Sequence, residues 1–146
     1  LSPQIKSTNF LNNILAKRES VAAGTFDSLF LNWKDELTEC TVSNLFFISG
    51  KTLHTPALDC GILDGITRTI VMTLAQEEGI PVREGHYHLA DLQRAEECFL
   101  TNTSMEIMPV NRVDSFAIGD GRPGSLTRRL QTRFADSRTR FLEPPS

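Results

Sequence analysis

Apolar residues follow two kinds of spacing along the chain of 146 residues. Near-helical spacing predicts helices over 8–23, 65–78 and 123–138, and a short one over 89–95. Runs rich in β-branched and aromatic residues predict strands at 4–6, 28–31, 37–48, 52–54, 81–84, 97–101 and 107–110. Short polar turns join the strands between 28 and 54, so part of the sheet is expected to be antiparallel. The pattern therefore predicts a mixed α/β domain.

The stretch 37–48, LTECTVSNLFFI, predicts a buried strand that carries a carboxylate at Glu39. A buried carboxylate costs free energy unless a cation or several hydrogen-bond donors stabilise it. Glu39 therefore lies either at a solvated strand end or beside a cationic partner. The residue pattern by itself leaves both possibilities open.

Composition and charge describe an ordinary globular protein and exclude some classes of partner. Apolar residues make up 40% of the chain, charged residues 23%, and the net charge is −3. A negative net charge gives no general attraction to nucleic acid or anionic membranes. No apolar run approaches the roughly 18 residues of a membrane span. We therefore expect neither a nucleic-acid partner nor a membrane partner.

The cysteines and histidines lack the spacing of a metal site. Cys40, Cys60 and Cys98 are far apart and form no CxxC pair, which is typical of reduced thiols in a cytoplasmic protein. His86 and His88 have no carboxylate or thiol at ligand spacing, which favours surface histidines. The sequence thus predicts a cytoplasmic protein without a metal centre.

Two small polar clusters could donate hydrogen bonds to an anion. Asp64 is suited to cap the helix over 65–78, and Gly65 would let another group approach the free N–H groups at its start. The second cluster, TNTS at 101–104, follows the strand over 97–101. Each cluster is also explained by plain helix capping or turn chemistry.

Five motifs occur in order along the chain: IKSTNFLNNILAKRE, LTECTVSNLFF, GILDGITR, FLTNTSMEIMPV and IGDGRPG. Their order and separations resemble the C-terminal domain of the class IV (fold-type IV) pyridoxal-phosphate aminotransferases. That family includes branched-chain and D-amino-acid aminotransferases and aminodeoxychorismate lyase. The resemblance covers about residues 5–134 and implies a mixed α/β fold, with a partly barrel-like sheet flanked by helices.

The resemblance also implies roles for individual residues. Lys6 corresponds to the lysine that binds the cofactor aldehyde covalently and then transfers a proton. Glu39 corresponds to the carboxylate that keeps the pyridine nitrogen protonated, so its cationic partner would belong to pyridoxal 5'-phosphate. Leu63 corresponds to the apolar residue against one ring face. The residues expected at the phosphate are Gly65, Ile66, Thr67, Asn102 and Thr103, and those expected to support Glu39 are Thr41, Ser43 and Asn44.

The implied activity is amino-group transfer between an amino acid and a 2-oxo acid, of the branched-chain or D-amino-acid type. Cys40, directly after Glu39, resembles some aminodeoxychorismate lyases, which release 4-aminobenzoate and pyruvate, whereas the residues after Asn102 resemble aminotransferases. By itself Cys40 is expected to be a small core residue. The family's N-terminal domain has no counterpart in residues 1–146. The chain is therefore expected to be one cofactor-binding domain of a homodimer, with an inactive domain or fragment as an alternative.

Overall fold

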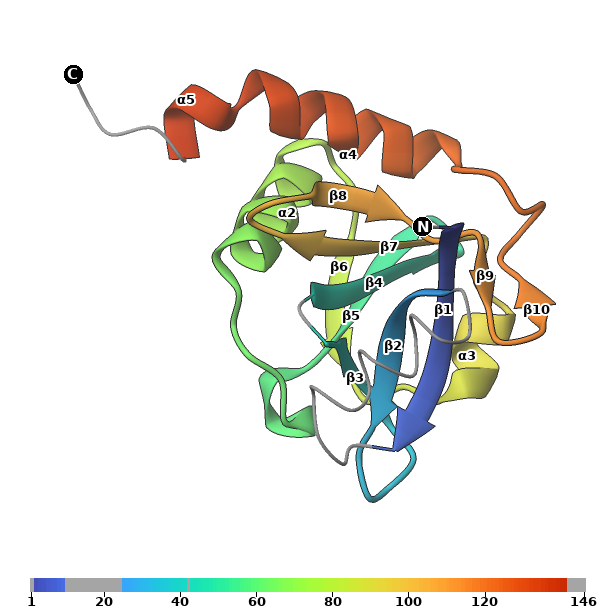
Figure 1. Ribbon diagram of the computed structural model, residues 1–146. Coiled ribbons are helices and arrows are strands. Elements are labelled where there is room, and N and C mark those ends of the chain that lie inside the picture. The colour runs from blue at the N-terminus through green and yellow to red at the C-terminus, as the bar shows by residue number, and fades with distance from the viewer. Residues whose placement is uncertain (1, 10–24, 42, 142–146) are drawn as a thin grey trace.

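The computed structural model describes residues 2–9, 25–41 and 43–141, where helices flank a single sheet (Figure 1). The helices are α2 (Ile66–Glu77), α3 (Leu89–Gln93), α4 (Ser125–Asp136) and α5 (Arg138–Phe141), with a 3-10 helix over Leu58–Cys60. The predicted mixed α/β architecture is confirmed. Within the described ranges, no helix is long and apolar enough to cross a membrane.

Among the described residues, the sheet has ten strands. They are β1 (Ser2–Asn9), β2 (Thr25–Leu31), β3 (Leu37–Cys40), β4 (Ser43–Ser49), β5 (Thr52–Pro56), β6 (Val82–Gly85), β7 (Glu97–Asn102), β8 (Glu106–Pro109), β9 (Arg112–Val113) and β10 (Phe116–Ala117). The order is β10-β9-β1-β2-β3-β4-β5-β6, and the β7–β8 hairpin pairs with β4. Asn44 of β4 pairs with Glu39 of β3 on one side and with Thr101 of β7 on the other. The strands that carry the polar motifs therefore meet at the start of β4.

Both faces of β4 are covered by apolar side chains. Phe46 and Ile48 pack with α2 and α4, and Phe46 stacks on Phe99 of β7 with ring centroids 5.1 Å apart. Leu45 and Phe47 alternate with them and belong to a second cluster on the opposite face. Burial on both faces explains why the middle of β4, residues 45–48, is continuously apolar.

The single strand predicted over 37–48 is wrong, because this stretch is a hairpin. β3 ends at Cys40, β4 begins at Ser43, and these two residues face each other across the ladder. The residues around the turn, TECTVSN at 38–44, include no glycine or proline, so the change of direction was not visible in the sequence pattern. The hairpin places Glu39 directly opposite Asn44.

The predicted helix over 8–23 is also wrong at its start. β1 continues through Asn9, since Lys6 pairs with Ser28 and Asn9 with Leu31 in a parallel ladder with β2. Lys6 therefore lies inside a strand, and not between the predicted strand over 4–6 and the predicted helix over 8–23. Pairing with β2 has overridden the local helical pattern at the start of that prediction. Residues 10–23 of this prediction lie outside the described residues.

The start of α4 is fixed by the carboxylate of Glu97, at the beginning of β7. Its Oε1 accepts a hydrogen bond from the backbone N–H of Thr127 (2.8 Å), and its Oε2 one from Leu126 (3.4 Å). A methyl group at Gly124, the residue before the helix, would lie 2.1 Å from the carboxyl carbon. Glycine at this position therefore lets a strand carboxylate cap α4 from outside the helix.

Replacing Glu97 with alanine should lower the free energy of unfolding by about 1–3 kcal/mol, because two N–H groups at the start of α4 lose their acceptor. Glu97→Gln keeps one acceptor oxygen and should lose less. Urea denaturation of both variants measures the difference. Wild-type stability of Glu97→Ala would show that the cap contributes nothing.

The arginine-rich face of α4 and α5 lies partly exposed and forms ion pairs within the chain. Arg133 and Arg140 pair with Glu77 of α2, and Arg138 pairs with Glu106 of β8. Surface pairs of this kind contribute little to stability, because solvent screens them. The arginines thus add modestly to the packing of α4 and α5 against α2 and β8.

Candidate active site

The polar motifs converge on a pocket of about 250 Å³ between the β3–β4 hairpin, the start of α2 and the end of β7. Its lining residues are Glu39, Thr41, Ser43, Asn44, Leu63, Gly65, Ile66, Thr67, Thr101, Asn102 and Thr103. This set contains every site residue expected from the sequence except Lys6. The pocket therefore joins segments more than sixty positions apart in the sequence.

The backbone of Lys6 lies in the same part of the sheet. Lys6 pairs with Ser28, and the next residue of β2, Leu29, pairs with Cys40 of β3. Adjacent strands lie about 4.8 Å apart, so the β1 backbone is roughly 10 Å from β3. Lys6 is thus placed two strands away from the hairpin that carries Glu39.

Glu39 is partly desolvated and forms no ion pair with another described residue. Its Oε1 accepts a hydrogen bond from the backbone N–H of Leu63 at 3.3 Å. Burial raises the pKa of Glu39, and the hydrogen bond from Leu63 offsets part of this effect. Glu39 is therefore a pocket carboxylate that a cation would stabilise.

Asn44 holds the same loop from the opposite strand of the hairpin. Its Nδ2 donates to the carbonyl of Leu63 at 2.9 Å, while Glu39 accepts from the N–H of that residue. A methyl group at Gly65 would lie 2.4 Å from Asn44 Oδ1, so only glycine allows this approach. Leu63 and Ile66 keep 75% and 71% of their surface exposed and form an apolar rim to the pocket.

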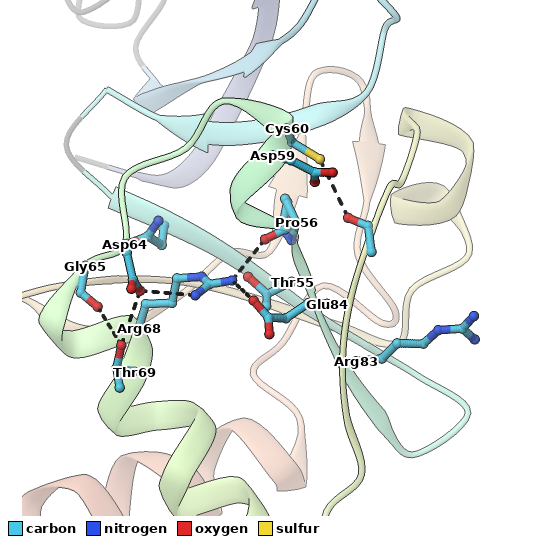
Figure 2. Close-up of polar contacts among 12 residues, drawn as sticks. Thr55, Pro56, Asp59, Cys60, Asp64, Gly65, Arg68, Thr69, Arg83 and Glu84 are labelled. Carbon is cyan, nitrogen blue, oxygen red and sulfur yellow. Dashed lines mark hydrogen bonds and ion pairs between the residues drawn. The ribbon is translucent and has the colours of Figure 1, made fainter.

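The start of α2 is open toward the pocket. Gly65 occupies the N-cap position without a side-chain hydrogen bond, so the expectation that Asp64 caps the helix is wrong. Asp64 Oδ1 instead accepts from Thr69 Oγ1 and pairs with Arg68 (Figure 2). Because the first N–H groups of a helix lack intrahelical acceptors, this end can bind an anion.

Two buried hydroxyls line the pocket beside this helix start. Thr67 and Thr101 are 2% and 1% exposed, and neither Oγ1 has a hydrogen-bond partner in the described structure. Buried polar atoms are nearly always hydrogen-bonded, so unsatisfied hydroxyls indicate a missing ligand or water. Together with the N–H groups of α2, they form a set of donors suited to a phosphate group.

The family resemblance placed Thr103 but not Thr101 at the phosphate, although both belong to the TNTS cluster at 101–104. Thr103 is exposed, whereas Thr101 lies in β7 directly opposite Asn44. The neighbouring Asn102 supports the turn, since its Nδ2 donates to Ser43 Oγ (3.2 Å) and its Oδ1 accepts from Met105 (2.7 Å). Strand alternation could have directed attention to Thr101, but only the register of β4 and β7 places it in the pocket.

Arg68 fixes the loop that leads into α2. It is 3% exposed, and its Nη2 donates to the carbonyl of Pro56 (3.1 Å) and to Glu84 Oε1 (2.6 Å). Its Nη1 lies 3.3 Å from Asp64 Oδ1 (Figure 2). Arg68 therefore ties α2, β5 and β6 together beneath the pocket.

Replacing Arg68 with methionine should lower the free energy of unfolding by about 2–4 kcal/mol, because hydrogen bonds between a buried cation and several acceptors are lost. Arg128→Met, on the exposed face of α4, is the matched control and should change stability by less than about 0.5 kcal/mol. Chemical denaturation compares the two variants. Equal stabilities would contradict the role given to Arg68.

Comparison with known proteins places the chain in a family. The model of the amino-transferase class IV family matches residues 1–113. A putative branched-chain-amino-acid aminotransferase of Methanocaldococcus jannaschii is 40% identical over 97% of this chain and 49% of its own length. A D-alanine aminotransferase of Listeria monocytogenes is 38% identical (93% and 47%), and the aminodeoxychorismate lyase of Bacillus subtilis 35% identical (88% and 43%). The chain thus spans about half the length of these curated relatives.

Solved structures agree with the sequence matches. The Escherichia coli branched-chain amino acid aminotransferase has a TM-score of 0.88 and 28% identity, over 91% of this chain and 51% of that one. A T.th. branched-chain amino acid aminotransferase, solved with pyridoxamine 5'-phosphate, has a TM-score of 0.87 and 28% identity over 92% and 50%. From the family match, the fold and the pocket together, we conclude that the chain belongs to the class IV aminotransferases.

Proposed function

We propose that this chain is the cofactor-binding domain of a pyridoxal-phosphate-dependent aminotransferase. The observation that carries the proposal is the pocket in which the carboxylate of Glu39 faces the same space as the open start of α2. Two orphan hydroxyls, of Thr67 and Thr101, line that space as well. A ligand with a cationic ring nitrogen and a phosphate dianion would satisfy both ends of the pocket.

The phosphate of pyridoxal 5'-phosphate would be held at the start of α2. The N–H groups of Ile66 and Thr67, with the hydroxyls of Thr67 and Thr101, supply uncharged donors to a dianion. Gly65 leaves room for Asn44 and the loop to approach this end of the helix. Thr103 would add a further hydroxyl from the β7–β8 turn.

Three further residues would act on the ring and the substrate. Glu39 would keep a proton on the pyridine nitrogen, and Leu63 would pack on a ring face from the pocket rim. Lys6 would hold the cofactor covalently and then carry a proton at Nζ to and from the substrate carbon. When bound, the cofactor supplies an electron sink for the negative charge left on that carbon.

We further propose that the substrates are an amino acid and a 2-oxo acid and that the active form is a homodimer in the cytoplasm. The relatives named as branched-chain and D-alanine aminotransferases favour this reaction. The similarity to an aminodeoxychorismate lyase keeps that lyase as the alternative. Since the relatives are about twice as long as the matched region, activity is proposed for a protein that also contains the remaining half of the fold.

Two assays on that longer protein distinguish the reactions. With cofactor present, amino transfer from branched-chain L-amino acids and from D-alanine to a 2-oxo acid is measured alongside release of 4-aminobenzoate from aminodeoxychorismate. We expect transfer that depends on the oxo acid. Release of 4-aminobenzoate without amino transfer would assign the lyase. Absence of both activities in a cofactor-loaded protein would overturn the proposed function.

A further inference from the structure

A second group of reactive side chains lies outside the pocket. Glu36, just before β3, Cys60 in the 3-10 helix and His86, after β6, have their ligand atoms within 4.8 Å of one another. His86 Nδ1 is 2.9 Å from Glu36 Oε2 and 3.5 Å from Cys60 Sγ. Three separate segments therefore direct a carboxylate, a thiol and an imidazole at one point.

Backbone hydrogen bonds fix these segments independently of the side chains. Glu36 forms a β-bridge with His88, and the N–H of Leu37 donates to the carbonyl of Tyr87 at 2.7 Å. The N–H of Ala57, at the start of the 3-10 helix, donates to the carbonyl of Gly85 at 2.9 Å. Each candidate ligand is thus next to a backbone contact that holds its position.

Side chains around the cluster orient two of the three ligands. Asn32 donates to the second oxygen of Glu36 at 3.0 Å. The other ring nitrogen of His86, Nε2, is 3.1 Å from Asp59 Oδ1. A metal-bound histidine usually donates its remaining ring N–H to a carboxylate in this way, which fixes the tautomer that coordinates.

The cluster concentrates negative charge around a single histidine. Glu36 and Cys60 are 7% and 4% exposed. Burial and the Glu36 carboxylate raise the pKa of the Cys60 thiol. Hydrogen bonds from Asn32 and His86 lower the pKa of Glu36. A divalent cation would offset the cost of burying this carboxylate and would favour the thiolate.

We propose that Glu36, Cys60 and His86 form a binding site for Zn²⁺. One oxygen, one sulfur and one nitrogen are a ligand set that zinc accepts in tetrahedral geometry, with a fourth position for water. At usual bond lengths tetrahedral ligands are about 3.4–3.6 Å apart, close to the observed spacing of Cys60 and His86. Glu36 Oε2 and His86 Nδ1 are 2.9 Å apart, so on zinc binding the distance between them would increase by about 0.5 Å. Binding releases the Cys60 thiol proton, and any proton on His86 Nδ1, to solvent.

His86 is exposed, as the sequence predicted, but it also has a thiol and a carboxylate beside it that no local spacing indicated. The thiol and carboxylate partners lie 26 and 50 positions away in the sequence. They are therefore absent from any local ligand motif. The plain alternative is a Glu36–His86 ion pair beside an inert thiol.

The test measures metal binding, so its result does not depend on the enzymatic activity. The protein is stripped with chelator and titrated with Zn²⁺ and with Co²⁺, with the stoichiometry read by native mass spectrometry and the thiolate-to-Co²⁺ absorption read in parallel. We expect one metal ion per chain and a Co²⁺–thiolate band. Cys60→Ser, His86→Asn and Glu36→Gln should each weaken Zn²⁺ binding at least tenfold, and His88→Asn, a neighbouring histidine outside the cluster, should leave it unchanged.

Circular dichroism of the metal-free variants shows whether each one is folded. Weaker zinc binding by a folded variant is then due to the missing ligand and not to unfolding. Zn²⁺ should raise the thermal midpoint of the wild type and of His88→Asn but not that of folded Cys60→Ser. If no zinc binds, or if Cys60→Ser binds it as tightly as the wild type, the site is only an ion pair with a buried thiol.

Discussion

Replacing Glu39 with glutamine in the cofactor-loaded protein is expected to lower kcat by about 10²–10³-fold, the effect typical of removing a preorganised electrostatic partner. Glutamine fills the same space but cannot hold a proton on the pyridine nitrogen, so the ring withdraws electrons less well. The cofactor should remain bound, because the proposed phosphate contacts and the proposed bond to Lys6 are unchanged. Steady-state kinetics and the cofactor content of the same samples measure both effects.

The same substitution is expected to leave folding stability unchanged or higher near neutral pH. A carboxyl whose pKa is raised by burial binds its proton more tightly in the folded state. Its contribution to stability is therefore largest at low pH and is lost as the pH rises from the unfolded to the folded pKa. Glu96→Gln, at an exposed site outside the pocket, is the control and should keep wild-type kcat. Wild-type kcat in Glu39→Gln would remove Glu39 from its proposed role.

The second large effect is expected from Thr67→Val and Thr101→Val. Each removes a hydroxyl proposed to donate to a phosphate, and a hydrogen bond to a charged acceptor contributes about 1.5–3 kcal/mol. Each variant should therefore weaken the binding of pyridoxal 5'-phosphate about tenfold or more. Without cofactor, both should be as stable as the wild type or more stable, since the hydroxyls have no partner in the described structure.

Thr127→Val is the matched control for these variants. Thr127 is also buried, and its Oγ1 also lacks a described partner, but it lies at the start of α4 and does not line the pocket. It should change stability to a similar extent and leave the affinity for the cofactor unaltered. Fluorescence titration with pyridoxal 5'-phosphate and urea denaturation give the two quantities. A stability loss with unchanged affinity in Thr67→Val and Thr101→Val would contradict the phosphate assignment.

Elements with strong periodic patterns were predicted well from the sequence. The apolar stripe of α2 and the short aromatic strand β7 follow directly from residue spacing, and both were found within two residues of their predicted ends. Burial of Cys40 in the core was also predicted, and its side chain is 1% exposed. These features depend on contacts of neighbouring residues, which a local pattern records.

Features that depend on distant pairing were not predictable in this way. The length of β1 is set by its parallel ladder with β2, and the hairpin at 37–48 turns at residues that carry no glycine or proline to mark it. Thr101 enters the pocket only through the register of β7 against β4. The cluster of Glu36, Cys60 and His86 is assembled from three segments that share no sequence motif. In each case tertiary contacts decide a position that local propensity leaves undetermined.

The most direct test of the account is to identify the lysine that binds the cofactor. The protein is loaded with pyridoxal 5'-phosphate, reduced with borohydride, digested and mapped by mass spectrometry, with Lys6→Ala treated in parallel. We predict one phosphopyridoxyl group on Lys6 and none in the variant. A group on Lys17, Lys34 or Lys51, or none on the wild type, would contradict the proposed cofactor site.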